Sequence, residues 1–141
     1  MLFRSEQAIE EAGLKVPRRF VVEVPEFSRA EGERGMRTLL SATEPPDAVF
    51  CFSDLLALGA LRAAADAGAR VPDDVAVMGF DDIDDARFAV PALSTVAVDK
   101  AEIARLAVTR LLARLDGDSG RPAHHNAPYR LMPRESTAPA R

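Results

Sequence analysis

Three residues, Phe27, Ser53 and Asp81, each follow a short apolar run that is typical of a buried strand. The carboxyl ends of parallel strands meet at one edge of a sheet, and α/β proteins bind their ligands there. An aromatic ring can cover the C–H face of a sugar, a carboxylate accepts hydrogen bonds from neighbouring hydroxyls, and a serine both donates and accepts. We therefore predict that these three residues contact a small polyhydroxylated ligand.

The four aspartates Asp81, Asp82, Asp84 and Asp85 allow two other interpretations. Aspartates that follow a strand commonly cap the next turn, and from these residues alone that role is the more frequent one. Hard cations also prefer carboxylate oxygens, so a metal site for phosphoryl chemistry is the second interpretation. No lysine or threonine at a neighbouring strand end stands out as a partner for such chemistry, so we predict no metal at this loop.

The residue types that catalysis requires do not occur in a productive pattern. Ser53 lacks the Gly-x-Ser-x-Gly setting of an activated serine, and the sequence has neither a phosphate-binding glycine loop nor a Cys–His pair. His124 and His125 are adjacent, so in an extended segment their side chains point to opposite sides. We predict two exposed loop histidines, no catalytic residues, no cofactor and no enzyme activity.

The composition describes one soluble domain. A chain of 141 residues with 48% hydrophobic and 28% charged residues is long enough for a real core. A net charge of −4 argues against nucleic-acid binding by this segment itself. The one cysteine, Cys51, lies in an apolar run and is predicted to be a buried, inert thiol. No apolar stretch reaches the ~18 residues of a membrane span and no signal-peptide pattern opens the chain, so we predict a cytoplasmic protein without a membrane partner.

Strand and helix patterns alternate along the chain. Ser28 and Glu31 form a capping box, Ser53 and Asp54 are good N-cap residues, and Asp99 can cap the last long helix. The alternation predicts right-handed βαβ units and a three-layer α/β sandwich around a parallel sheet. The expected helices are Ser5–Ala12, Arg29–Leu40, Leu55–Ala67 and Ala101–Leu115; the expected strands are Phe20–Val24, Ala48–Phe52, Val75–Met78, Ser94–Val98 and Tyr129–Met132, with a loop over 81–91 and a polar tail over 133–141.

Four longer motifs follow one another in the chain: Pro46-Asp-Ala-Val-Phe-Cys-Phe-Ser-Asp-Leu-Leu-Ala-Leu-Gly-Ala-Leu-Arg62, Gly68-Ala-Arg-Val-Pro-Asp-Asp-Val-Ala-Val-Met-Gly-Phe-Asp-Asp82, Pro91-Ala-Leu-Ser-Thr-Val96 and Leu131-Met-Pro-Arg-Glu-Ser-Thr137. With these motifs the chain resembles the lactose-repressor/galactose-repressor (LacI/GalR) family of bacterial transcription regulators. No single motif is specific, but the set occurs in the family's order and spacing across nearly all 141 residues. The match is to the carboxyl-terminal half of the family's effector-binding core.

The resemblance implies a periplasmic-binding-protein-like fold, with two α/β subdomains and the effector in the cleft between them. It places residues 1–93 and 123–137 in the carboxyl-terminal subdomain and residues 94–122 in a segment that packs on the other subdomain. At the matching positions, Asp81 hydrogen-bonds the effector, Ser53 stands where many members have an effector-contacting asparagine, and Phe27 matches an aromatic that packs on the ligand.

The resemblance also implies partners. The family's effectors are sugars or related small molecules, its members dimerise through the core, and an amino-terminal helix-turn-helix binds operator DNA. We expect Leu58 and Phe88 at the dimer face of a homodimer, with plain core packing as the alternative role for this apolar region.

The chain departs from the family pattern in what it lacks. Nothing in it resembles the helix-turn-helix, the hinge or most of the first subdomain, and the family's effector-binding arginine would precede Met1. Lys100 stands where some sugar-binding members place an apolar residue. We expect a truncated effector-sensing part that by itself binds neither DNA nor effector tightly, and whose apolar stripe over Ala101–Leu115 promotes association or marginal stability. A periplasmic sugar-binding protein of a transport system is the alternative function, and an enzyme on a flavodoxin-like sheet is a third.

Overall fold

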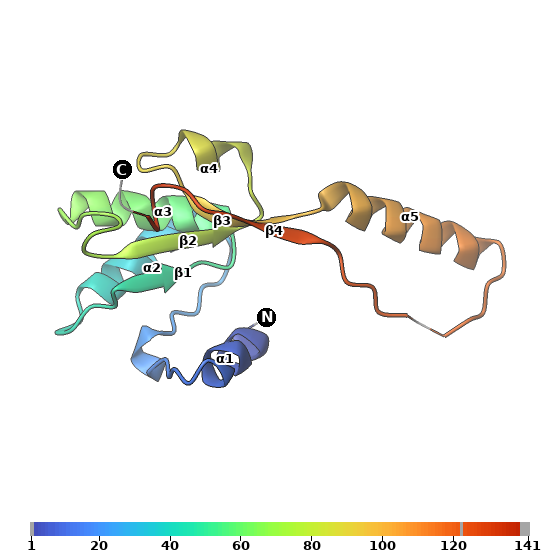
Figure 1. Ribbon diagram of the computed structural model, residues 1–141, viewed down its shortest axis with the longest axis horizontal. Coiled ribbons are helices and arrows are strands. Elements are labelled where there is room, and N and C mark those ends of the chain that lie inside the picture. The colour runs from blue at the N-terminus through green and yellow to red at the C-terminus, as the bar shows by residue number, and fades with distance from the viewer. Residues whose placement is uncertain (1, 122, 139–141) are drawn as a thin grey trace.

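The computed structural model describes residues 2–121 and 123–138. Figure 1 shows a body of sheet and helices from which one long helix projects. The helices are α1 (Leu2–Glu11), α2 (Arg29–Leu40), α3 (Asp54–Asp66), α4 (Asp84–Phe88) and α5 (Lys100–Leu115), with a 3-10 turn η1 (Arg18–Phe20). The strands are β1 (Ala48–Phe50), β2 (Ala76–Phe80), β3 (Ser94–Val98) and β4 (Tyr129–Met132). Within this described part, no helix combines the length and the apolar character that crossing a bilayer would need.

The described strands form one sheet in the order β1-β2-β3-β4. Strands β1, β2 and β3 run parallel, with Val49 opposite Val77 and Gly79 opposite Thr95, whereas β4 pairs with β3 in the antiparallel direction. The direction of β4 follows from the path of the chain, because the chain leaves β3, runs out along α5 and returns to the same edge (Figure 1). The predicted α/β fold is confirmed, with a mixed sheet in place of a purely parallel one.

Helices α2 and α3 pack against each other and against the sheet. Both are capped as predicted, since Ser28 Oγ accepts from the Glu31 N–H and Ser53 Oγ from the Leu56 N–H, each at 3.3 Å. The two helices approach so closely that a Cβ on Gly32 would lie 2.0 Å from the Leu56 carbonyl oxygen. Small and medium apolar side chains fill the core beneath them: Met36, Leu56, Ala57, Ala60, Ala63, Ala64, Val75 and Val77.

Cys51 directly follows β1 and is buried, as predicted. Burial raises the pKa of its thiol to about 12, and the neighbouring Asp54 carboxylate adds to the rise. Because the thiolate is the nucleophilic form, this cysteine is chemically inert at neutral pH.

The strand predicted over Phe20–Val24 is wrong. Phe20 closes the turn η1, and residues 21–24 pair with no strand in the part of the chain that the structure describes. Branched valines favour a strand, but a strand also needs a neighbouring backbone with which to pair. The space between this segment and β1 is a cavity.

Two segments predicted to be irregular contain more order than expected. The loop over 81–91 includes the short helix α4. The predicted polar tail includes Ser136, which is fully buried. Its hydroxyl donates to the Val77 carbonyl at 2.6 Å and accepts from the Ser94 N–H at 2.8 Å. The tail therefore connects β2 to β3 through the hydrogen bonds of Ser136.

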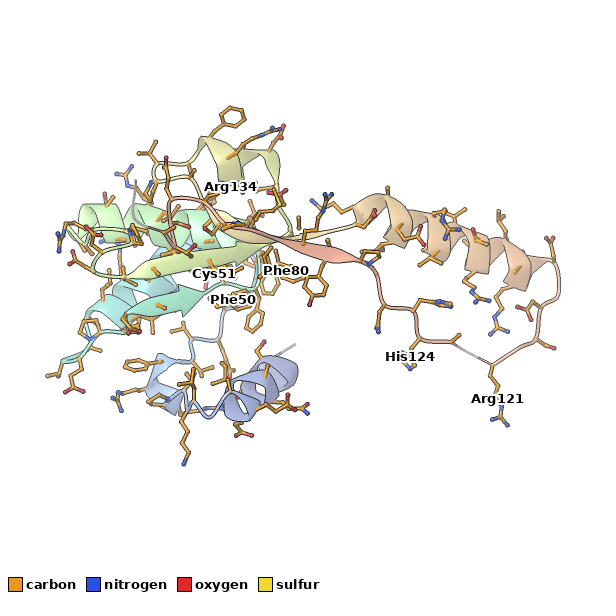
Figure 2. The ribbon with its side chains drawn as sticks, viewed as in Figure 1. Phe50, Cys51, Phe80, Arg121, His124 and Arg134 are labelled. Atoms are coloured by element: carbon orange, nitrogen blue, oxygen red, sulfur yellow. The ribbon has the colours of Figure 1, made fainter. Side chains whose placement is uncertain are left out.

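Helix α5 projects from the body and has no buried residues. Figure 2 places Arg121 and His124 on the segment that returns from it, far from the sheet. Strand β3 pairs with β2 through residues 94–96, and the projecting part of the chain begins after Val98. The packing of residues 94–122 on another subdomain stays a prediction. The large apolar side chains exposed on α5 are Ile103, Val108, Leu111, Leu112 and Leu115.

Candidate functional site

The turn after β2 carries two aspartates at the carboxyl edge of the sheet, and its backbone is unusual. Asp81 and Asp82 have φ angles of 112° and 48°, a region that residues with side chains rarely adopt. Two hydrogen bonds hold the turn: the Asp81 N–H donates to the Val96 carbonyl at 3.0 Å, and the Asp82 N–H donates to Thr95 Oγ1 at 3.3 Å. Because strained backbone concentrates at binding and catalytic sites, this turn is the candidate site.

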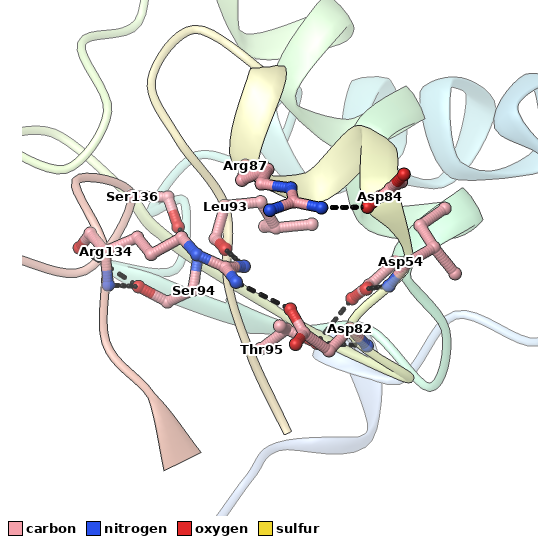
Figure 3. A network of polar contacts seen from close by, with 10 residues as sticks. Asp54, Asp82, Asp84, Arg87, Leu93, Ser94, Thr95, Arg134 and Ser136 are labelled. Atoms are coloured by element: carbon pink, nitrogen blue, oxygen red, sulfur yellow. Dashed lines mark hydrogen bonds and ion pairs between the residues drawn. The ribbon is translucent and has the colours of Figure 1, made fainter. Parts of the chain in front are cut away.

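A buried carboxylate supports the turn. Asp54, in the first turn of α3, is fully buried. Its Oδ1 accepts from Thr95 Oγ1 at 2.6 Å, and its Oδ2 accepts from the Ile83 N–H at 2.9 Å (Figure 3). Gly79 makes room for this group, since a Cβ there would lie 2.1 Å from Asp54 Oδ1. Sequence reasoning assigned Asp54 only a capping role and Thr95 none, yet the two residues connect α3, β3 and the turn.

Arg134, from the carboxyl-terminal motif, fixes the second aspartate of the turn. Its Nη2 donates to Asp82 Oδ1 at 2.6 Å, and its Nη1 donates to the Leu93 carbonyl at 2.7 Å (Figure 3). The Arg134 and Asp82 side chains are 17% and 27% exposed, so this ion pair is less screened by solvent than a surface pair. The Asp82 carboxylate is thus held in an ion pair that stabilises the turn, whereas Asp81 faces a cavity.

Asp81 opens into a cavity of about 510 Å³ at the carboxyl edge of the sheet. Burial raises the pKa of its carboxyl, the Asp54 carboxylate adds to the rise, and Lys100 opposes it. Among the described residues, no donor is hydrogen-bonded to this carboxylate. The cavity is lined by Asp81, Asp82, Ala97, Val98, Asp99, Lys100, Pro128, Tyr129 and Arg130.

The side chains around this cavity suit a small polar ligand. Asp81 accepts hydrogen bonds, Lys100 and Arg130 donate them, and the Tyr129 hydroxyl does both. The Tyr129 ring is 68% exposed, so it also offers an apolar surface. Together these groups can bind the hydroxyls and the C–H face of one polyhydroxylated molecule.

Asp81→Asn is expected to raise the melting temperature at neutral pH by about 2–4 °C. The pKa of Asp81 is raised in the folded state, so its ionisation opposes folding, and stability is lost as the pH rises through this pKa. The asparagine amide does not ionise, and asparagine tolerates positive φ. Thermal melts followed by circular dichroism should show the advantage at pH 7 and its decline as the pH falls below the ordinary carboxyl range. Equal melting temperatures at pH 7 would contradict the expectation.

The structure does not bring the three predicted ligand residues into one cavity. Phe27 is 52% exposed and lines a second, apolar cavity beside β1. Ser53 is buried, and its hydroxyl caps α3. Asp81 is the one of the three that lines the edge cavity. Contacts of Phe27 and Ser53 with a ligand stay predictions.

The other aspartates of the cluster and the two histidines lie at the surface. Asp84 and Asp85 each pair with an arginine. His124 and His125 are exposed, as predicted. Across residues 2–121 and 123–138, no three His, Cys, Asp or Glu side chains are grouped closely enough to hold a metal ion.

A family match covers nearly the whole chain. The family described as a periplasmic binding protein-like domain matches residues 1–137. The HTH-type transcriptional repressor PurR of Escherichia fergusonii is 39% identical over 132 residues, which are 94% of this chain and 38% of that protein. The chain therefore spans less than two fifths of the length of this curated relative.

Solved structures agree with the sequence match. A LacI-type transcription regulator from Bifidobacterium animalis subsp. lactis is 34% identical, with a TM-score of 0.85 over 94% of this chain and 48% of that one. The complex of the transcriptional regulator CelR with cellobiose is 35% identical, with a TM-score of 0.84 over 93% of this chain and 40% of that one. The chain belongs to the LacI/GalR-type family of periplasmic-binding-protein-like domains and is the carboxyl-terminal part of an effector-binding core.

Proposed function

We propose that this chain is the effector-sensing part of a LacI-type transcriptional regulator whose effector is a sugar or a related polyhydroxylated molecule. The observation that carries the proposal is the Asp81 carboxylate, which a strained turn holds at the sheet edge facing a polar cavity. A carboxylate in this setting accepts hydrogen bonds from two neighbouring hydroxyls. The relatives support the proposal, since they are transcriptional regulators and one of them is in complex with cellobiose.

In this proposal the effector changes how the whole regulator binds DNA. The effector favours one of two arrangements of the subdomains, and this arrangement alters the operator affinity of a helix-turn-helix segment outside residues 1–141. Because residues 1–141 carry a net charge of −4, DNA binding is the role of such a segment and not of this chain. A cytoplasmic location is part of the same proposal. The relatives named above favour this function over a transport binding protein or an enzyme.

Saturation-transfer NMR with a panel of mono- and disaccharides tests the proposal. We expect weak binding, because in the family the effector lies between two subdomains and this chain supplies mainly one of them. Asp81→Asn should reduce the affinity at least about tenfold, the contribution of a hydrogen bond to a charged group.

Asp84→Asn is the matched control for this experiment. Asp84 lies in the same loop, but it pairs with Arg87 at the surface, so its replacement should leave saccharide binding unchanged. A panel in which no saccharide binds, or binding that is equally strong in Asp81→Asn, would refute the proposal.

We also propose that the regulator is a homodimer with Leu58 and Phe88 at the dimer face. Phe88 ends α4 and is 76% exposed, while Leu58 on α3 packs on the core and stays partly exposed. Exposed aromatic residues are enriched at protein interfaces. Leu58→Glu combined with Phe88→Glu should convert a dimer of the complete regulator to monomers in sedimentation velocity, and an unchanged mass would count against this face.

A further inference from the structure

The cavity at Asp81 contains two positively charged side chains that a neutral effector does not require. Lys100 begins α5 and Arg130 lies on β4, and both residues line the cavity. In the antiparallel ladder Arg130 is opposite Ala97, which lines the same cavity. Residues opposite each other share one face of a sheet, so the small alanine leaves space beside the Arg130 side chain.

These two cations have no partner in the described part of the chain. Across residues 2–121 and 123–138, neither side chain takes part in a hydrogen bond or an ion pair. Both residues are exposed, so their N–H donors are accessible from the cavity. An anionic group that enters the cavity can therefore pair with Lys100 and Arg130 without breaking an existing contact.

Two of the three aspartates at the cavity already have partners. Asp82 is paired with Arg134 (Figure 3), and Asp99 caps α5 by accepting from the Glu102 N–H at 2.9 Å. Among the described residues, Asp81 alone of the three has neither kind of contact and remains for a ligand. The cavity thus offers a ligand one carboxylate and two cations.

We propose that the effector is a polyhydroxylated molecule that carries an anionic group, either a carboxylate or a phosphate ester. Its hydroxyls donate to Asp81, and its anionic oxygens accept from Lys100 and Arg130. This inference rests on the function proposed above and adds the charge of the ligand to it. The cavity of about 510 Å³ is within the size range of small-molecule sites and is large enough for a monosaccharide with such a substituent.

A neutral sugar and a cationic amino sugar fit these charges less well. A neutral sugar can donate to Asp81, but its hydroxyls form weaker hydrogen bonds with Lys100 and Arg130 than anionic oxygens do. An amino sugar can pair with Asp81, but its ammonium group is repelled by the two cations that line the same cavity. The expected order of affinity is therefore acidic sugar, neutral sugar, amino sugar.

NMR titrations of the full chain with glucuronate, glucose and glucosamine test this order, and the corresponding galactose series is measured beside them. Within a series the sugars share one ring and differ in charge. We expect the acidic sugar to bind about tenfold more tightly than the neutral one, the contribution of a charge-assisted hydrogen bond. The amino sugar should bind most weakly. Glucose 6-phosphate in the same assay distinguishes a phosphate ester from a carboxylate as the preferred anionic group.

Removal of the two cations should abolish the preference for the acidic sugar. In Lys100→Gln combined with Arg130→Gln, the ratio of glucuronate to glucose affinity should fall to about one. Arg121→Gln is the matched control, because Arg121 lies on the segment that returns from α5, far from the sheet (Figure 2). This control should keep the ratio of the wild type. The sugar series uses the unaltered protein, so it remains decisive even if the double variant fails to fold.

The outcomes separate this inference from the function on which it rests. Equal affinities of the acidic, neutral and amino sugars would overturn the inference and leave the proposed function intact, and so would tightest binding of an amino sugar. No binding by any of these sugars would overturn both. Inorganic phosphate that binds as tightly as glucose 6-phosphate would show that the cations bind anions without regard to the sugar, which would also overturn the inference.

Discussion

Asp54→Ala is expected to lower the free energy of unfolding by about 3 kcal/mol. The substitution leaves the buried Thr95 hydroxyl and the Ile83 N–H without the acceptor that they share. Each buried donor without a partner costs about 1–3 kcal/mol, and the missing side chain leaves a void beside Gly79. Urea denaturation of both proteins, followed by circular dichroism, measures the difference.

Two further variants show whether the network is responsible. Asp84→Ala removes a carboxylate that pairs with Arg87 at the surface, so the free energy of unfolding should change by less than about 1 kcal/mol. Thr95→Val should be destabilising alone, and combined with Asp54→Ala it should cost less than the sum of the two, because one hydrogen bond is removed in both. An Asp54→Ala protein as stable as the wild type would refute the supporting role of Asp54.

The apolar stripe of α5 is expected to make this chain associate in solution. Val108, Leu111, Leu112 and Leu115 recur at helical spacing, and their exposed fractions run from 55% to 74%. Soluble monomers rarely expose such contiguous apolar surface. Multi-angle light scattering should therefore report at least twice the 15.2 kDa mass of one chain.

A charge within the stripe should reverse this association. Leu111→Glu places a carboxylate among the apolar side chains, and the measured mass should return to that of a single chain. Thr109→Glu is the matched control, because it adds the same charge to an exposed position of α5 about a quarter turn from the stripe. A wild-type chain that stays monomeric at high concentration would contradict the prediction.

Local signals made most helices predictable. The hydroxyls of Ser28 and Ser53 cap α2 and α3 as their positions suggested, and Asp99 caps α5 by accepting from the Glu102 N–H at 2.9 Å. Gly68, with φ of 73°, follows the end of α3 as predicted. Each of these features depends on residues within one helical turn, so a single sequence contains the whole cause.

Strand pairing depends on distant residues, and there the sequence was a weaker guide. Residues 21–24 have the branched side chains of a strand, but strand identity requires a neighbour that no local pattern reveals. For Ser136 the sequence predicted too little structure. This short polar residue belongs to a predicted polar tail, yet it is fully buried between two strands.

Of the residues at the candidate site, only Asp81 could be predicted from the sequence. Asp81 could be placed at a strand end from the apolar run before it. Its supports could not, because Asp54 and Thr95 are 41 residues apart and Asp82 and Arg134 are 52 apart. Periodicity describes single elements, so a polar network among three elements leaves no local signature.

Arg134 holds the Asp82 turn, and Ser136 connects β2 to β3. Both residues are translated after the elements that they contact, so these contacts form late during synthesis on the ribosome. At about 5–20 residues per second, the 52 residues between Asp82 and Arg134 take roughly 3–10 s to translate. During that interval α2, α3 and β2 can already pack, while the Val77 carbonyl and the Ser94 N–H lack their partner Ser136. The turn at Asp81 and Asp82 and the β2–β3 contact made by Ser136 are therefore completed only after residues 134–136 have been synthesised.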